Sequence, residues 1–228
     1  MNVDAATSRT IPPDADPDAP KRVPRKQSRE ARRQQLIEAT IAVLAERGYA
    51  RTTLTEVARH AGLSHGLVIF HFQSKERLLE ETLLFLSEEY RENWAAALAA
   101  APDAPAAQLD ALLRADFMPP ICAPDRLAAW CGFWGEAQSR PMYQDKCSVN
   151  DDDYNAVIEG ICARLVRDGG YAADPVLAAR VLRVTVEGVW QDMMTMTEPY
   201  SADEGLRTVM ACAQAFFPDH FTLAGLRR

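Results

Sequence analysis

The sequence has no long hydrophobic run and no cysteine pair. Its 228 residues contain no stretch of about 18 apolar residues, so we expect no transmembrane helix. The acidic, Pro-rich N-terminus also has no apolar segment of the kind that secretory signals carry. The five cysteines are an odd number without C-x-x-C spacing, which is typical of reduced thiols, at Cys122, Cys131, Cys147, Cys162 and Cys212. We therefore expect a cytoplasmic protein that binds no membrane.

The sequence also lacks the common motifs of catalysis. It contains no H-E-x-x-H and no glycine-rich loop for phosphate. A metal sensor would need a cluster of imidazole or thiol ligands, and none occurs at suitable spacing. The sequence thus predicts neither an enzyme nor a cofactor or metal site.

Positive charge is scarce overall and concentrated in one section. The chain carries a net charge of −7, yet residues 21–77 hold 12 Lys/Arg against 5 Glu. A basic section on an acidic protein indicates a confined surface for a polyanion. The alternative, chance clustering on a solvated surface, becomes weaker once the next motif is considered.

Residues 53–72, TLTEVARHAGLSHGLVIFHF, have the features of two short helices joined by a tight turn. Thr53 and Glu56 have the spacing of a capping box, Gly62 can adopt the left-handed conformation that ends a helix, and Ser64 is a favourable N-cap. The pattern predicts a helix-turn-helix whose second helix, His65–His71, enters the DNA major groove.

This stretch resembles the TetR family of one-component transcriptional regulators. The family pattern, A-G-[VL]-S-x-G-x-[LVI]-Y-x-H-F-x-x-K, is matched at Ala61, Gly62, Leu63, Ser64, Gly66, Val68, His71, Phe72 and Lys75. The usual Tyr is replaced by Ile69, at a position that commonly touches a phosphate. The resemblance implies an all-α protein with an N-terminal three-helix DNA-binding domain and a C-terminal helical domain for ligand binding and dimerisation.

A helix that begins at Ser64 would place Val68 and Phe72 in the core and its other face in the groove. We expect His65, Gly66, Leu67 and Ile69 to face base edges, with Thr55 close to them. Basic side chains suit phosphates, which set affinity rather than sequence preference. The predicted DNA-binding residues are Lys26, Arg29, Arg33, Thr53, Thr55, Ser64, His65, Gly66, Leu67, Ile69, His71 and Lys75. For His71, packing on the core is an equal alternative.

The domain boundaries follow from composition and helical spacing. We predict a disordered tail at 1–24, a helix-turn-helix domain at 25–74, a connecting helix at 75–101, and a ligand-binding and dimerisation domain at 102–228. Within the last domain we expect helices at about 106–118, 124–138, 150–168, 174–197 and 202–217. Asp151–Asp153 would occupy the first turn of the third of these, and Pro141 would act as a helix breaker.

The last two predicted helices each carry an apolar stripe. Two recognition helices about one DNA turn apart require a two-fold partner, which is an independent physical reason for a homodimer. The TetR resemblance implies that the helices at about 174–197 and 202–217 pair as a four-helix bundle. The alternative is that both stripes are core of one domain.

Residues 126–143 contain the second informative motif. Trp130 and Trp134 are one helical turn apart, beside Phe133, and acids lie near in sequence. Two such indoles beside acids favour an aromatic box for a cation, although aromatics at helical spacing are also typical of core, which we expect for Phe133. The predicted ligand-binding residues are Trp130, Trp134, Tyr143, Tyr154, Glu187 and Trp190.

This sensor segment and the E-G-V-W run at 187–190 resemble the choline-responsive BetI branch of TetR regulators. The resemblance implies a repressor of osmoprotectant genes that binds a palindromic double-stranded operator and is released by a small effector, choline or another quaternary ammonium ion. Two alternatives remain open: a TetR-type repressor of an efflux or catabolic operon with another lipophilic or cationic ligand, and a thiol redox sensor.

Overall fold

The protein is built almost entirely from α-helices. The computed structural model describes residues 28–137 and 141–227, and only the backbone is described for Ala137, Met142 and Tyr143. The expected tail at 1–24 and the predicted DNA contact Lys26 lie outside these residues. None of the described helices combines the length and apolar composition that crossing a bilayer requires.

Three helices form the N-terminal unit: α1 (Arg29–Arg47), α2 (Leu54–Ala61) and α3 (His65–Phe72). The side chains of the N-cap residues Ser28, Thr53 and Ser64 accept hydrogen bonds from backbone N–H groups in the first turns, and the last two were expected from the sequence. Gly62 takes the left-handed conformation (φ 64°) that turns the chain from α2 into α3. The helix-turn-helix prediction is therefore confirmed.

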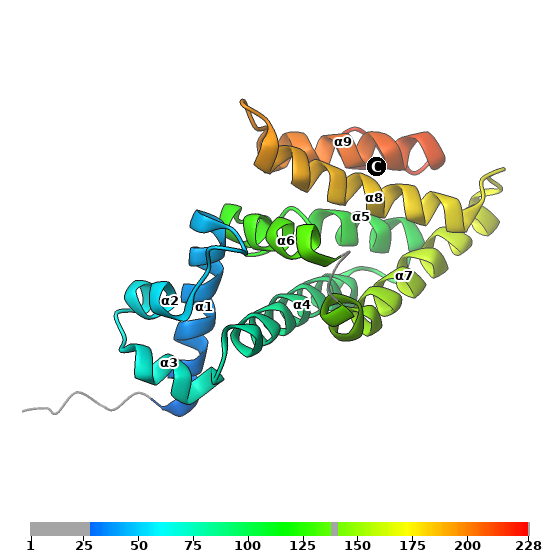
Figure 1. Cartoon of the computed structure of the whole chain (residues 1–228). Helices are drawn as coiled ribbons and strands as arrows, with labels where there is room; N and C mark the ends of the chain where they lie inside the picture. Colours follow the sequence, from blue (N-terminus) through cyan, green and yellow to red (C-terminus); the bar gives the residue numbers. More distant parts are fainter. Residues whose placement is uncertain (1–27, 138–140, 228) are drawn as a thin grey trace, which may run out of the picture.

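One long helix leads from the N-terminal unit into the second half of the molecule (Figure 1). This helix, α4 (Lys75–Ala100), is capped by Ser74 and extends for 26 residues, about 39 Å. Its first turns bury leucines in the same core as α1–α3, whereas Trp94, nearer its C-terminus, belongs to a second core. The connecting helix thus shares side chains with both hydrophobic cores.

The second half contains α5 (Pro105–Ala115), α6 (Pro124–Ala137), α7 (Pro141–Gly169), α8 (Pro175–Thr195) and α9 (Ala202–Phe216). The expected start of α7 at about 150 was wrong, because the helix begins nine residues earlier with Pro141 as its first residue. Proline is tolerated there since the first N–H groups of a helix have no intrahelical partner. Asp151–Asp153 consequently lie in the middle of α7 and not in its first turn.

A short hairpin, β1 (Phe221–Thr222) and β2 (Gly225–Leu226), follows α9 and was not expected. Arg114 of α5 donates to the Ala224 carbonyl at 2.8 Å, and Asp110 accepts from the Leu226 N–H at 3.1 Å. The hairpin is therefore attached to α5, and Phe221 is fully buried beneath it.

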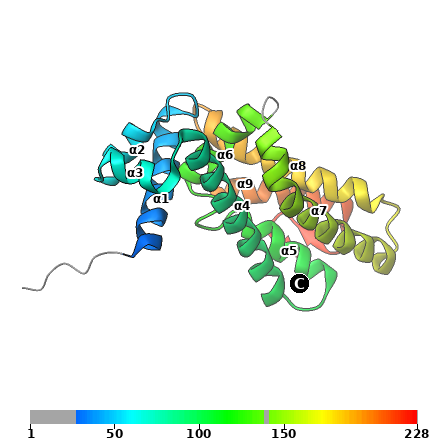
Figure 2. The same cartoon turned by 60° about the horizontal axis from the view of Figure 1, so that its bottom comes forward.

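Helix α6 lies between the two halves (Figures 1 and 2). Its residues Ala129, Trp130 and Phe133 are buried in the core of the N-terminal unit. Phe133 makes an edge-to-face contact with Tyr49, at 5.8 Å between ring centroids, which confirms Phe133 as a core residue. The helix that carries the tryptophan pair thus packs directly on the DNA-binding unit.

Candidate functional site

The exposed face of α3 forms the candidate nucleic-acid surface. Val68 and Phe72 are buried, as expected, whereas His65 and Gly66 are exposed and Leu67 is half-buried. Ile69 is 43% exposed although it is a large apolar residue. A Cβ on Gly66 would meet no atom of the protein within 4 Å, so the space beside Gly66 is open to a bound molecule.

The polar side chains near the start of α3 make hydrogen bonds within the helix-turn-helix. Thr53 Oγ1 accepts from the Glu56 N–H at 3.2 Å, and Ser64 Oγ accepts from the Leu67 N–H at 3.3 Å. Thr55 Oγ1 lies 3.4 Å from His65 Nδ1. The last contact brings α2 and α3 together at the edge where base contacts were predicted.

The basic side chains predicted to contact phosphates differ in the partners that they have within the protein. Arg29 is exposed, with its guanidinium 5.7 Å from the Phe70 ring centroid. Arg33 is held by an ion pair with Glu81. Lys75 Nζ donates to the carbonyls of Tyr49 and Ala50 at 3.2 and 3.1 Å. Lys75 thus stabilises the loop after α1, and its contact with phosphate stays a prediction.

Two side chains at the end of α3 add to this surface. His71 Nδ1 is buried without a hydrogen-bond partner among the described residues. Burial, followed by the charges of Arg29 and Arg33, lowers the pKa of His71, so the ring is neutral at physiological pH. Phe70, which the sequence reasoning missed, is 65% exposed. The only sequence signal for it was an apolar residue on the polar side of a short helix.

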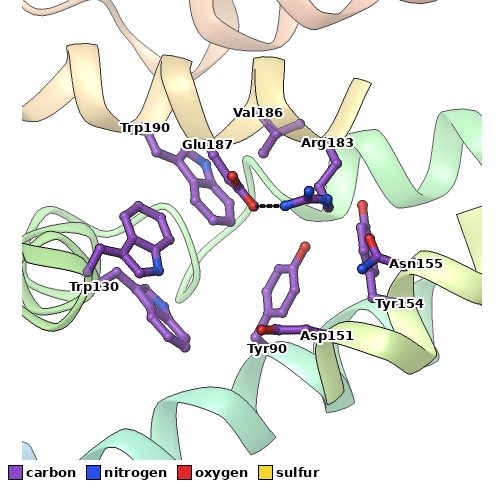
Figure 3. A pocket seen from close by; sticks show the side chains of 10 residues that line it. Tyr90, Trp130, Asp151, Tyr154, Asn155, Arg183, Val186, Glu187 and Trp190 are labelled. Atoms are coloured by element: carbon purple, nitrogen blue, oxygen red, sulfur yellow. Dashed lines mark hydrogen bonds and ion pairs between the residues drawn. The ribbon is translucent and has the colours of Figure 1, made fainter. Parts of the chain in front are cut away.

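A cavity of about 420 Å³ opens between α4, α6, α7 and α8. Figure 3 shows its aromatic walls: Trp130 comes from α6, Trp190 from α8, Tyr90 from α4 and Tyr154 from α7. Trp130 and Trp134 are stacked, with ring centroids 6.0 Å apart and an interplanar angle of 27°. Five of the six predicted ligand-binding residues line this one cavity: Trp130, Trp134, Tyr154, Glu187 and Trp190. The side chain of the sixth, Tyr143, lies outside the described residues.

Five further residues line this cavity and were not predicted from the sequence: Tyr90, Asp151, Asn155, Arg183 and Val186. No role was predicted for Tyr90. Asp151 was assigned to a helix start, because α7 was thought to begin just before it. Of the acids near in sequence, Asp145 pairs with Lys146 and Asp192 accepts from the Tyr200 hydroxyl.

The charged side chains of the cavity are two acids and one arginine. Glu187 Oε1 lies 2.5 Å from Arg183 Nη1, one helical turn away on α8. Asp151 faces this pair from α7 (Figure 3). The cavity wall desolvates Asp151, and with the negative charge of Glu187 this raises the pKa of Asp151 to about 6, although the residue is accessible from the cavity mouth. At neutral pH the lining therefore carries an excess of negative charge.

The five cysteines are all unpaired thiols. Burial raises the pKa of each, to about 12 for Cys147 and Cys162. A reactive thiol needs a lowered pKa, so these surroundings oppose redox sensing. Within the described ranges, no group of three or more His, Cys, Asp or Glu side chains is arranged to hold a metal ion.

Comparison with known families matches both halves of the chain. Residues 36–82 match the model described as bacterial regulatory proteins, tetR family, and residues 105–218 match that of the BetI-type transcriptional repressor, C-terminal. The HTH-type transcriptional regulator BetI of Burkholderia thailandensis is 33% identical over 174 residues, which cover 74% of this chain and 84% of the relative. A second relative, the regulator BetI 2 of Chromohalobacter salexigens, is 32% identical over 160 residues, 70% of this chain and 75% of that protein.

Solved structures share the fold. A putative transcriptional regulator from Pseudomonas aeruginosa superposes with a TM-score of 0.72 at 26% identity, covering 85% of this chain and 93% of that one. A putative regulator from Saccharomonospora viridis, solved in complex with choline, has a TM-score of 0.72 at 19% identity and covers 88% and 100%. The matched families and relatives are transcriptional regulators rather than enzymes. The chain therefore belongs to the TetR family of bacterial regulatory proteins and, within it, to the BetI-type transcriptional repressors.

Proposed function

We propose that the protein binds a palindromic operator as a homodimer and releases it when a choline-like quaternary ammonium ion occupies the cavity between α4, α6, α7 and α8. The observation that carries the effector class is that the stacked pair Trp130 and Trp134 lines the same cavity as Trp190, and that this lining has an excess of negative charge. The proposed targets are osmoprotectant genes, as the resemblance to the BetI branch implies.

A quaternary ammonium ion cannot donate an N–H hydrogen bond, so it is recognised by negative ring faces and by carboxylates at contact distance. Aromatic side chains from four helices supply the negative ring faces, and each ring contact contributes about 0.5–2 kcal/mol. Asp151 and Glu187 supply the carboxylates, and the guanidinium of Arg183 forms an ion pair with Glu187. Asn155 offers an amide that can hydrogen-bond to a hydroxyl on the ligand. The choline complex of the Saccharomonospora viridis regulator supports the same ligand class on the same fold.

Exposed apolar residues on α8 support the proposed dimer. Leu177 is 48% and Val184 51% exposed, and Gly188 lies on the same side of the helix one turn further. On α9 the neighbouring surface carries the small residue Ala211. Small residues allow helices to approach closely, and a two-fold axis beside α8 and α9 would bury these side chains in a four-helix bundle. The second recognition helix would then lie about one DNA turn, roughly 34 Å, from the first.

In this dimer the start of α3 enters the major groove. His65 and Thr55 present hydrogen-bonding groups to base edges, and Ile69 offers an apolar contact for thymine methyls. Arg29 and Arg33 lie beside the groove edge for phosphate contacts. Phe70 joins this surface, since its ring is largely exposed and lies beside the guanidinium of Arg29.

Release requires that the ligand favour a conformation that does not fit the operator. Trp130 belongs both to the cavity wall and to the core of the DNA-binding unit. A ligand that displaces this indole therefore moves α6 against α1, and α4 with it, which changes the separation of the two recognition helices.

A larger lipophilic cation is the second candidate effector. A cavity of about 420 Å³ lies within the range of about 300–1,000 Å³ that holds drug-sized ligands. The efflux or catabolic alternative thus predicts that a bulky aromatic cation binds more tightly than choline.

The test follows tryptophan fluorescence and operator binding together. A duplex selected in vitro for binding is titrated with protein, and then with choline, betaine aldehyde, tetramethylammonium and a bulky aromatic cation. We expect choline to quench or shift tryptophan emission and to release DNA over one concentration range. Release by the aromatic cation alone would favour the second candidate, and no response to any of the four would contradict the proposed effector class.

A further inference from the structure

One buried carboxyl, Asp116, connects three aromatic side chains of the cavity without lining it. It is the C-cap residue of α5 and is fully buried. Its Oδ1 accepts from the Tyr90 hydroxyl at 3.1 Å and its Oδ2 from the Tyr154 hydroxyl at 3.4 Å. Its backbone carbonyl accepts from Trp190 Nε1 at 3.1 Å. Residues of α4, α7 and α8 are thus held by a single residue of a helix that contributes nothing else to the cavity.

No cationic side chain neutralises this carboxyl among the described residues. The titratable groups that face it are Tyr90 from α4, Tyr154 from α7, Glu187 from α8 and Cys122 from the segment after α5. Burial, together with the charge of Glu187, raises the pKa of Asp116 to about 7 against the lowering effect of the two tyrosine hydroxyls. Removing a carboxylate from water is costly unless an opposite charge compensates for it.

The tyrosines transmit the charge of this carboxyl to the cavity. Burial first, and then the charge of Asp116, raises the pKa of both phenols well above its usual value. Both hydroxyls therefore stay protonated and donate hydrogen bonds to the carboxyl. A phenol that donates to an anion gains electron density, which makes its ring face more negative. The rings of Tyr90 and Trp190 meet edge to face at 6.0 Å, so the polarised ring belongs to the wall that a cation would contact.

We propose that Asp116 is the specificity-determining residue that makes the cavity select a cationic ligand over a neutral one of the same shape. A cation on the ring faces of Tyr90, Tyr154 and Trp190 supplies a positive charge opposite the Asp116 carboxylate. Its binding favours the ionised carboxyl, whose proton passes to the solvent. Because the dielectric constant around Asp116 is low, the attraction is stronger than between exposed groups at the same distance. This inference rests on the proposed function, since it explains how a quaternary ammonium ion is preferred.

The test compares choline with its neutral carbon isostere, 3,3-dimethylbutan-1-ol. Asp116→Asn keeps the shape and can still hydrogen-bond both tyrosines, but removes the charge. We expect the variant to bind choline at least about tenfold more weakly and to bind the isostere within about twofold of the wild type. The matched control is Asp203→Asn, which removes the same charge from an exposed residue in the first turn of α9 and should change neither affinity.

A second measurement needs no variant. Calorimetry of choline binding to the wild type at pH 7, in two buffers of different ionisation enthalpy, should show release of about half a proton per site. In Asp116→Asn the release should fall to the small contribution of Asp151.

The outcomes separate cleanly. Equal losses for choline and the isostere would reduce Asp116 to a structural role and overturn the inference, and so would unchanged choline binding or no proton release. Wild-type protein that binds neither choline nor tetramethylammonium would overturn the proposed function as well.

Discussion

Arg126 Nη1 of α6 lies 2.9 Å from Glu38 Oε2 of α1, so the helix with the tryptophan pair is bonded directly to the first helix of the DNA-binding unit. The same guanidinium donates from Nε to Glu89 of α4 at 3.0 Å, and only 11% of its side chain is exposed. One buried arginine thus joins α4 and α6, which both line the cavity, to α1 of the DNA-binding unit. A partly buried, bidentate arginine keeps its geometry far better than an exposed ion pair does.

We predict that Arg126→Met uncouples ligand binding from DNA release. Choline affinity should change by less than about threefold, whereas the ratio of choline affinities without and with operator should fall toward one. Tryptophan fluorescence titrations with and without duplex measure this ratio. Arg91→Met, which removes an arginine paired with Glu88 on the surface of α4, is the control and should keep the ratio. An unchanged ratio in Arg126→Met would show that coupling bypasses this ion cluster.

The two stacked tryptophans should differ in what their removal costs. Trp134→Ala is expected to weaken choline binding about 2- to 30-fold, the equivalent of one lost ring contact, with a small change in thermal stability because the side chain is half-buried. Trp130→Ala should lose both affinity and stability, since that indole is also part of the N-terminal core. Titration and thermal unfolding of the two variants separate the effects, and equal stability losses would contradict the assignment.

Choline affinity should rise with pH between about 5.5 and 8. The pKa of Asp116 is about 7 and that of Asp151 about 6, both above the usual carboxyl value. The cation favours the ionised forms, so binding is weakest where both carboxyls are protonated and strongest above pH 7. In the ligand-free protein the sign is opposite: a raised folded-state pKa means that stability falls as pH rises from about 4 to 7. Titrations and thermal unfolding across this range check both trends, and a flat affinity profile would contradict the charge assignment.

Ile69→Tyr should strengthen binding to selected and to unrelated DNA. The side chain is 43% exposed on the predicted groove face, and a phenol there can donate a hydrogen bond to a phosphate. One such bond corresponds to a gain of several-fold in affinity. Because tyrosine is neutral, the slope of log affinity against log salt should stay the same. Binding to selected and unrelated duplexes at several salt concentrations tests this, and an affinity that does not rise for either duplex would contradict a phosphate within reach of position 69.

Val184→Arg should dissociate the proposed dimer without unfolding the chain. The side chain is half-exposed on α8, so the arginine meets solvent in the monomer but a buried two-fold contact in the dimer. Light scattering should then give the mass of one chain, with operator affinity reduced at least about tenfold. Val149→Arg changes a more exposed valine on α7, and this variant should remain dimeric. A dimeric Val184→Arg protein would place the interface elsewhere.

Local signals accounted for the helix-turn-helix. Ser28, Thr53, Ser64 and Gly62 act within a few residues of themselves, so the start and end of these helices can be inferred from the sequence alone. The start of α7 was missed because proline is both a breaker inside a helix and a favoured first residue, and local sequence does not separate the two. That error concealed Asp151 as a cavity residue.

The sequence by itself determined the helices of the DNA-binding unit, the charge asymmetry and the aromatic character of the sensor, because each depends on side chains a few positions apart. Only the tertiary structure decided which carboxyls serve the cavity, since Asp116 and Trp190 are 74 residues apart in the sequence and meet only when the helices of the second half pack together. It also decided that Arg126 reaches Glu38 across 88 positions. Such contacts depend on how helices pack against one another, and helix packing is set by the whole apolar surface rather than by any local pattern.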